Sequence, residues 1–191
     1  MSLKFAILAA LLEGEFSGYD LAKSFDASVA NFWQTTPQQL YRELERLSAE
    51  GMIAPRVVEQ ERRPNKRVFR LTAAGRRALH EFTATPVQPT TIRDDLLVKV
   101  QGSDAGDAEA VIAAVEERME WSRAKLARFE RLRERMLDGR PESDYLREND
   151  RVGPYLTLLR GISFEKENLR WGEHAARILR QRAESGVSRP A

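Results

Sequence analysis

The chain has 191 residues, of which 42% are hydrophobic and 31% charged, and its net charge is +2. This length allows one or two small domains, and the mixed signs of charge exclude a disordered chain of one dominant charge. The longest apolar run, at 5–12, is too short to span a bilayer, and no signal peptide is evident. The absence of cysteine excludes disulfides and thiolate metal sites, so we expect a cytoplasmic protein without a membrane partner.

The first two helices are predicted from apolar spacing and a start signal. Residues 2–13 place Leu3, Ile7, Leu8, Leu11 and Leu12 on one helical face. Ser17, followed three residues later by Asp20, is a capping-box pattern that predicts the start of the second helix. Leu21, Phe25, Val29 and Phe32 recur along it at helical spacing.

The third helix has the clearest start signal in the sequence. Thr36 can cap it, Pro37 fits the first helical position, and Gln39 completes a capping box. Gly51 fits the position just past the helix end, where the backbone needs a positive φ. The predicted buried stripe is Leu40, Leu44 and Leu47. The opposite face carries Gln38, Tyr41, Arg42 and Glu45.

Two strands are predicted next, over 53–60 and 67–71. In the second, alternation turns Phe69 inward and Val68 outward. The turn between them, 62–66, consists of charged residues and helix breakers. A hairpin is therefore expected here, with a basic tip.

A fourth helix is predicted over 73–84, with Thr72 as its cap. Residues 85–91 contain two prolines without periodicity and indicate a linker. We therefore expect one domain over 1–85 and a second over 86–191.

The second domain is expected to be helical. A short helix around 96–100 precedes two long ones, over 107–137 and 152–183, whose apolar residues recur at three, four or seven positions. Helices with such a stripe usually need a partner, so we expect a homodimer. The candidate dimerisation residues are Ile112, Val115, Met119, Leu126, Phe129, Ile162 and Leu169.

The order of helices and hairpin predicts a mainly α protein. Its first domain is an α+β winged helix-turn-helix, and its second is an α-helical dimerisation domain with long helices. Positive charge is concentrated at 54–77, a segment that contains eight Lys or Arg residues and only two Glu residues. A phosphate backbone rewards such concentration, although a solvated basic loop would have the same composition.

Double-stranded DNA is therefore the expected partner. In this fold the third helix offers its exposed face to a major groove. Gln38 and Gln39 can bond an adenine edge in two places, and Tyr41 and Arg42 suit phosphate contacts. The candidate DNA-binding residues are Thr35, Thr36, Gln38, Gln39, Tyr41, Arg42, Arg62, Arg63, Lys66 and Arg67. Ordinary helix-start roles for Gln38 and Gln39, and half-buried packing of Tyr41, remain open.

Three stretches resemble the PadR family of transcriptional regulators. Residues 40–53 are similar to its recognition helix and exit, 18–21 to the start of its second helix, and 67–75 to its second wing strand and following turn. Phe69 stands where the family often has Tyr. The two long C-terminal helices resemble the longer PadR subfamily, with Trp171 as the most family-like residue.

The resemblance implies a dimeric repressor on a near-palindromic operator. It also implies release by a small-molecule effector, which in some members is a phenolic acid or another flat aromatic compound. Trp33, Trp121 and Trp171 are candidate ligand-binding residues, although large aromatics on helices more often belong to a core or an interface.

No enzyme, cofactor or metal site is predicted. The sequence has no phosphate-binding loop, nucleophile elbow or zinc-protease motif, and His80 and His174 stand far from other ligands in sequence. Two alternatives remain. One is another winged-helix regulator, for which the missing cysteines exclude thiol-based sensing. The other is a helical interaction module whose winged domain binds a protein partner.

Overall fold

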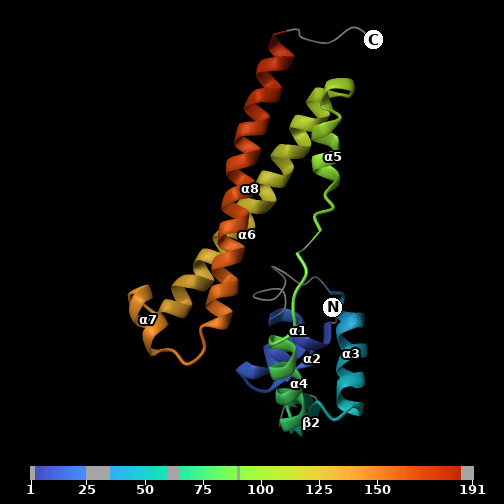
Figure 1. Cartoon of the computed structure of the whole chain (residues 1–191), viewed down its shortest axis with the longest axis vertical. Coiled ribbons are helices and arrows are strands. Elements are labelled where there is room, and N and C mark those ends of the chain that lie inside the picture. Colours follow the sequence, from blue (N-terminus) through green and yellow to red (C-terminus); the bar gives the residue numbers. More distant parts are fainter. Residues whose placement is uncertain (1–2, 25–34, 60–64, 90, 186–191) are drawn as a thin grey trace. The chain divides into compact units, whose positions relative to one another are not determined.

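The computed structural model describes residues 3–24, 35–59, 65–89 and 91–185. The chain divides into two compact units, Met1–Gln88 and Pro89–Ala191. The first unit combines helices with a small sheet, and the second is helical (Figure 1). The predicted boundary at 85/86 lies three residues before the one between these units.

The first unit is a winged helix-turn-helix. Its sheet has the order β1-β3-β2 with antiparallel pairing throughout, and the β2–β3 hairpin runs in register from Ile53 opposite Leu71 to Val58 opposite Lys66. The elements are α1 (Leu3–Ala10), η1 (Leu11–Glu13), β1 (Phe16–Ser17), α2 (Gly18–Ser24), α3 (Pro37–Ala49), β2 (Ile53–Val58), β3 (Lys66–Leu71) and α4 (Ala73–Thr83).

Local signals in the sequence set the helix boundaries of this unit. The Ser17 hydroxyl accepts a hydrogen bond from the Asp20 amide at 3.1 Å and donates one to the Asp20 carboxylate at 2.9 Å. Thr72 caps α4 by accepting from the Gly75 amide at 3.1 Å. Gly51 has a φ of +69°, so the chain leaves α3 through a conformation that glycine adopts without strain. Phe25, Val29 and Phe32, predicted to continue the second helix, lie outside the described residues, which end here at Ser24.

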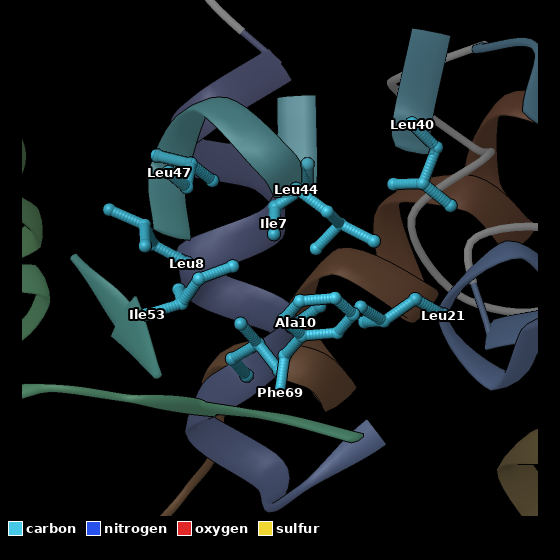
Figure 2. Close-up of a cluster of buried hydrophobic side chains, with 10 residues drawn as sticks. Ile7, Leu8, Ala10, Leu21, Leu40, Leu44, Leu47, Ile53 and Phe69 are labelled. Carbon is cyan, nitrogen blue, oxygen red and sulfur yellow. The ribbon is translucent and has the colours of Figure 1, made fainter. Parts of the chain in front are cut away.

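One apolar cluster holds the first unit together. Figure 2 shows side chains from α1, α2, α3, β2 and β3 meeting in it. Leu40, Leu44 and Leu47 are all fully buried, as the predicted stripe requires. Burial of one whole face of α3 leaves its opposite face to solvent. The cluster consists of Ile7, Leu8, Ala10, Leu11, Leu21, Leu40, Leu44, Leu47, Ile53 and Phe69.

The sheet departs from the prediction in one respect. Phe69 is buried as expected, but Val68 is buried as well, with 6% of its surface exposed. The two-residue strand β1 pairs Ser17 with Val68 and makes β3 the central strand. Val68 still points to the face opposite Phe69, as neighbours in a strand do, but the solvent exposure expected there is wrong. Alternation within a strand does not reveal what covers its second face or which short strand pairs with it.

The second unit is built on two long helices that lie side by side (Figure 1). Toward one end, Met119 of α6 lies so close to Gly172 of α8 that a Cβ at Gly172 would come within 2.6 Å of it. Toward the other, Phe129 packs with Leu158 and Ile162, so the two helices run antiparallel. The elements are α5 (Asp95–Gln101), η3 (Ser103–Ala105), α6 (Ala108–Leu137), α7 (Glu142–Glu148) and α8 (Gly153–Glu184).

The residues of the predicted dimerisation stripe are buried within a single chain. Five of its residues have at most 7% of their surface exposed, and Leu126 and Leu169 pack against the same clusters. An amphipathic stripe requires burial without specifying which helix provides it, and the return of the chain through α7 gives α6 its partner in α8. These side chains form the core of the unit rather than a free surface. The five are Ile112, Val115, Met119, Phe129 and Ile162.

No helix in the described part of the chain combines the length and apolar character needed to cross a membrane.

Candidate nucleic-acid interface

The outward face of α3 is polar and exposed. We define the α3 face as Gln38, Tyr41, Arg42 and Glu45. Tyr41 and Arg42 lie three and four residues after Gln38 and four and three before Glu45, the spacing of one helical face. All four are exposed, and Tyr41 keeps 47% of its surface accessible. The face offers amide, hydroxyl, guanidinium and carboxylate groups on one rigid helix.

Three of the predicted DNA-binding residues form hydrogen bonds with one another at the start of α3. The Thr36 hydroxyl accepts a hydrogen bond from the Gln39 amide at 3.2 Å, and the Gln39 side-chain oxygen accepts one from the Thr36 amide at 3.0 Å. Thr35 adds long contacts of 3.4 Å to both residues. A base contact by the Gln39 side-chain oxygen would compete with this capping box.

Tyr41 has a packing role as well as an exposed surface. A Cβ at Gly18 would lie 2.3 Å from Cε1 of the Tyr41 ring. The ring therefore rests on the backbone at the start of α2, and only glycine leaves room for it. This contact explains why a glycine stands at position 18. It also orients the Tyr41 ring, in accord with the alternative that Tyr41 packs half-buried.

Gln38 and Arg42 have neither a hydrogen bond nor an ion pair with any other described residue. Gln38 stands in the first turn of α3, where the helix dipole favours approach of an anion. Arg42 is one turn further along. These two side chains are the groups of the α3 face that are available without breaking a contact.

Two of the three cations of β3 are paired with carboxylates of the neighbouring helices. Lys66 lies 2.6 Å from Asp20, and its hydrogen bond lowers the pKa of that carboxyl group. Arg67 lies 2.6 Å from Glu45 and stacks over the Phe69 ring at 5.0 Å. DNA phosphates would have to compete with these carboxylates for Lys66 and Arg67. Arg62 and Arg63, predicted at the hairpin tip, lie outside the described residues.

A third ion pair joins β2 to the segment before β1. Arg56 bonds Glu15 through two guanidinium nitrogens, and the hydrogen bond lowers the pKa of the Glu15 carboxyl group, with Arg70 contributing at longer range. The hairpin is thus joined by ion pairs to three different parts of the helix-turn-helix. The hairpin carries an excess of positive charge, but most of its described cations are paired with carboxylates.

Of the two tryptophans that the structure describes, Trp121 lines the cavity between α5 and α6 and Trp171 does not. Trp121 is 63% exposed and lines a cavity of about 190 Å³ between α5 and α6. Trp171 packs instead against a cluster that includes Val115 and Met119. Trp33 lies outside the described residues. The cavity is lined by Asp95, Leu96, Lys99, Ala114, Glu117, Arg118 and Trp121.

Charges around this cavity are only partly matched. Arg118 donates to both carboxylate oxygens of Asp94, at 2.9 and 3.1 Å, and lowers the pKa of that group. Among the described residues, Asp95, Glu117 and Lys99 have no ion-pair partner. Within the same part of the chain, no group of three or more His, Cys, Asp or Glu residues could hold a metal ion.

Comparison with known proteins covers both units. Residues 7–81 match the model of the transcriptional regulator PadR-like family, and residues 92–180 match that of the virulence activator alpha C-terminal domain. The probable transcriptional regulator Rv1176c of Mycobacterium tuberculosis is 31% identical over 197 residues, which span 95% of this chain and all of that protein. The chain belongs to the PadR-like family. It is therefore a PadR-like transcriptional regulator, and the resemblance predicted from its sequence is confirmed.

The negative transcriptional regulator PadR of Bacillus subtilis is a second relative of this PadR-like chain. It is 28% identical, over 90% of this chain and 93% of its own length. Its crystal structure with operator DNA matches 93% of this chain and 98% of the solved one, with a TM-score of 0.75 and 26% identity. Its crystal structure with p-coumaric acid has a TM-score of 0.69 and 27% identity, covering 93% and 94%. The predicted winged helix-turn-helix with a helical second domain is thus confirmed.

Proposed function

We propose that this PadR-like regulator binds operator DNA as a homodimer and represses transcription. The observation that carries the proposal is the α3 face, where Gln38 and Arg42 stand exposed and unpaired among the described residues. An exposed glutamine at the start of a recognition helix can read an adenine edge, and an arginine one turn later can bond phosphate. The relative crystallised with operator DNA, and named a negative regulator, supports both binding and repression.

Lys66 and Arg67 would extend this contact along the DNA backbone. Each would exchange its present carboxylate partner for phosphate, so its contribution to affinity would be smaller than that of a free cation. Arg62 and Arg63 are proposed to add phosphate contacts from the hairpin tip, and Thr35 and Thr36 from the start of α3. The proposed interface thus combines two base-reading positions, Gln38 and Gln39, with a basic strand.

The homodimer is proposed to form through apolar groups that the fold leaves outside. On α8, Phe164, Trp171 and Ile178 follow one another at seven-residue steps, and Phe164 and Ile178 are 49% and 39% exposed. A second copy is the partner that suits such a stripe, because a two-fold dimer would place two α3 helices about one DNA turn apart or a multiple of it. Sedimentation of wild type and Phe164→Ser should show weaker dimerisation in the variant. An unchanged dimer would exclude this stripe as the interface.

The effector is proposed to be a small aromatic molecule that binds the cavity beside Trp121. The exposed indole can stack on a planar ring, and Leu96 and Ala114 provide apolar lining. The solved structure of PadR with p-coumaric acid supports a ligand of this size. Release of the operator by p-coumaric acid should be lost in Trp121→Ala. Equal release of both proteins would place the effector elsewhere.

The test of DNA binding is fluorescence anisotropy with the duplex upstream of the protein's own gene and a scrambled duplex, at two salt concentrations. Selective binding that weakens steeply with salt is expected, because phosphate contacts release counterions. Absence of binding at low salt would overturn the proposal. Weak, equal and salt-insensitive association would instead favour a winged unit that binds protein.

A further inference from the structure

Glu45 is the acidic member of the α3 face, and the fold gives it a specific partner. Its Oε1 lies 2.6 Å from Nη1 of Arg67, and its Oε2 lies 3.4 Å from Nη2. The Arg67 guanidinium in turn stacks over Phe69, which is 3% exposed. A rigid strand and a core aromatic ring therefore hold the cation that orients the carboxylate.

Stability does not account for this arrangement. The Glu45 and Arg67 side chains are 62% and 45% exposed, and ion pairs at such exposure contribute little to folding. A carboxylate on a face that approaches DNA also repels phosphates. Glu43 shows the contrast, since it bonds Arg46 within the same helix and lies outside the α3 face.

We propose that Glu45 is a specificity-determining residue for DNA; this inference rests on the proposed function. A carboxylate can only accept hydrogen bonds, and in the major groove cytosine N4 and adenine N6 are the donors. Guanine and thymine present acceptors at the corresponding edge, and phosphates carry negative charge. Glu45 therefore tolerates a sequence that places an amino group opposite it and penalises the others, which is selection by rejection.

Arg67 gives this selection a second effect. While Glu45 holds it, the guanidinium is less available to any phosphate, and sequence-independent binding depends on phosphate contacts. Removal of the Glu45 charge should therefore free one cation for random DNA. The same residue would limit non-specific binding and choose among base pairs.

The experiment compares Glu45→Gln with Glu43→Gln, which removes the same charge from the same helix. Affinities are measured by anisotropy, across a salt series, for the duplex that the wild type selects from a random pool and for a scrambled duplex. Glutamine keeps the shape of Glu45 and adds a donor. Thermal melts verify that both variants fold.

We expect Glu45→Gln to bind the scrambled duplex about threefold more tightly and to lose about tenfold in its preference for the selected duplex. Its salt slope on scrambled DNA should steepen by about 0.9, as one phosphate contact is added. Glu43→Gln should keep the wild-type preference. If each variant changed its affinity for the two duplexes by the same factor, Glu45 would have no role in specificity, while the proposed function would stand. A wild type without any preference would overturn the proposed function and this inference with it.

Discussion

The two units use their surfaces in opposite ways. In the winged unit, the helix face that remains outside is polar, and its Gln38 and Arg42 side chains have no partner among the described residues. In the helical unit the long helices bury their main apolar stripe against each other, and further apolar side chains remain outside, such as Trp121 and Phe164. A polar free face suits a polyanion, whereas an apolar one suits a second protein surface or a planar ligand.

Apolar periodicity alone therefore does not indicate which surface of a helix stays free. The stripes of α3 and α6 are both buried inside their own units. What distinguishes the units is the composition of the faces that remain after that burial.

The largest expected effect comes from the core of the helical unit. Phe129→Ala should reduce the free energy of unfolding by about 3–5 kcal/mol, because Phe129 is 1% exposed and its loss leaves a cavity. Phe164→Ala, at 49% exposure, should have little effect on folding but weaken self-association. Urea unfolding followed by circular dichroism, with sedimentation of both variants, measures the two effects. If Phe129→Ala instead dissociated the dimer without lowering the stability of the fold, the stripe that contains Phe129 would lie at the dimer interface.

The next effect concerns base reading by the winged unit. Gln38→Ala should weaken binding to the selected duplex by about 1–3 kcal/mol and leave binding to scrambled DNA nearly unchanged, if the amide reads a base in two places. Gln101→Ala, at the exposed end of α5, is the matched control and should change neither. Anisotropy titrations give both affinities. Equal losses on both duplexes would reduce Gln38 to a backbone contact.

A smaller effect is expected at the start of α3. Thr36→Ala removes the hydroxyl that accepts from the Gln39 amide and should cost the fold about 1 kcal/mol. Thr157→Ala provides the comparison in the helical unit, since its hydroxyl bonds Pro154 within α8 and caps nothing. Chemical denaturation of the two variants should show a clear loss only for Thr36→Ala. Equal stability would mean that the capping box contributes little.

The smallest effect depends on pH. Arg118 lowers the pKa of Asp94 in the fold, so the charged carboxylate stabilises the protein above its unfolded pKa of about 3.9 and this contribution is lost as pH falls through the lower, folded pKa. Asp94→Asn keeps a capping acceptor for α5 and removes the charge. The variant should be less stable at pH 7 by at most about 1 kcal/mol, and the difference should disappear under acid conditions. A difference that does not shrink as pH falls below the unfolded pKa of about 3.9 would exclude the ion pair as its cause.

Local chemistry explains how much of the fold was predictable. Ser17, Thr36 and Thr72 cap helices as the sequence indicates, and α6 begins and ends within one residue of its predicted bounds. The sequence does not predict strand β1, because two residues carry no periodicity and pair with a distant segment. The sequence does not predict helix α7 for a related reason, since its seven residues are too few for a pattern.

The candidate site was predictable in its position more than in its contacts. The sequence places Gln38, Tyr41, Arg42 and Glu45 on one face, and the structure exposes them. It could not reveal that Tyr41 rests on Gly18 or that Arg67 reaches Glu45, because those contacts join residues 22 or more positions apart. The spacing from Gln38 predicts the face on which Glu45 lies, but the sequence does not show which cation pairs with its carboxylate.

Oxidative footprinting of the full-length protein, with and without the selected duplex, tests most directly that the α3 face is the DNA interface. Tyr41 and Trp121 are both reactive side chains with accessible surface, at 47% and 63%, and they lie in different units. DNA should protect Tyr41 and leave the oxidation of Trp121 unchanged. Protection of Trp121 with no change at Tyr41 would contradict the assignment and direct attention to the helical unit.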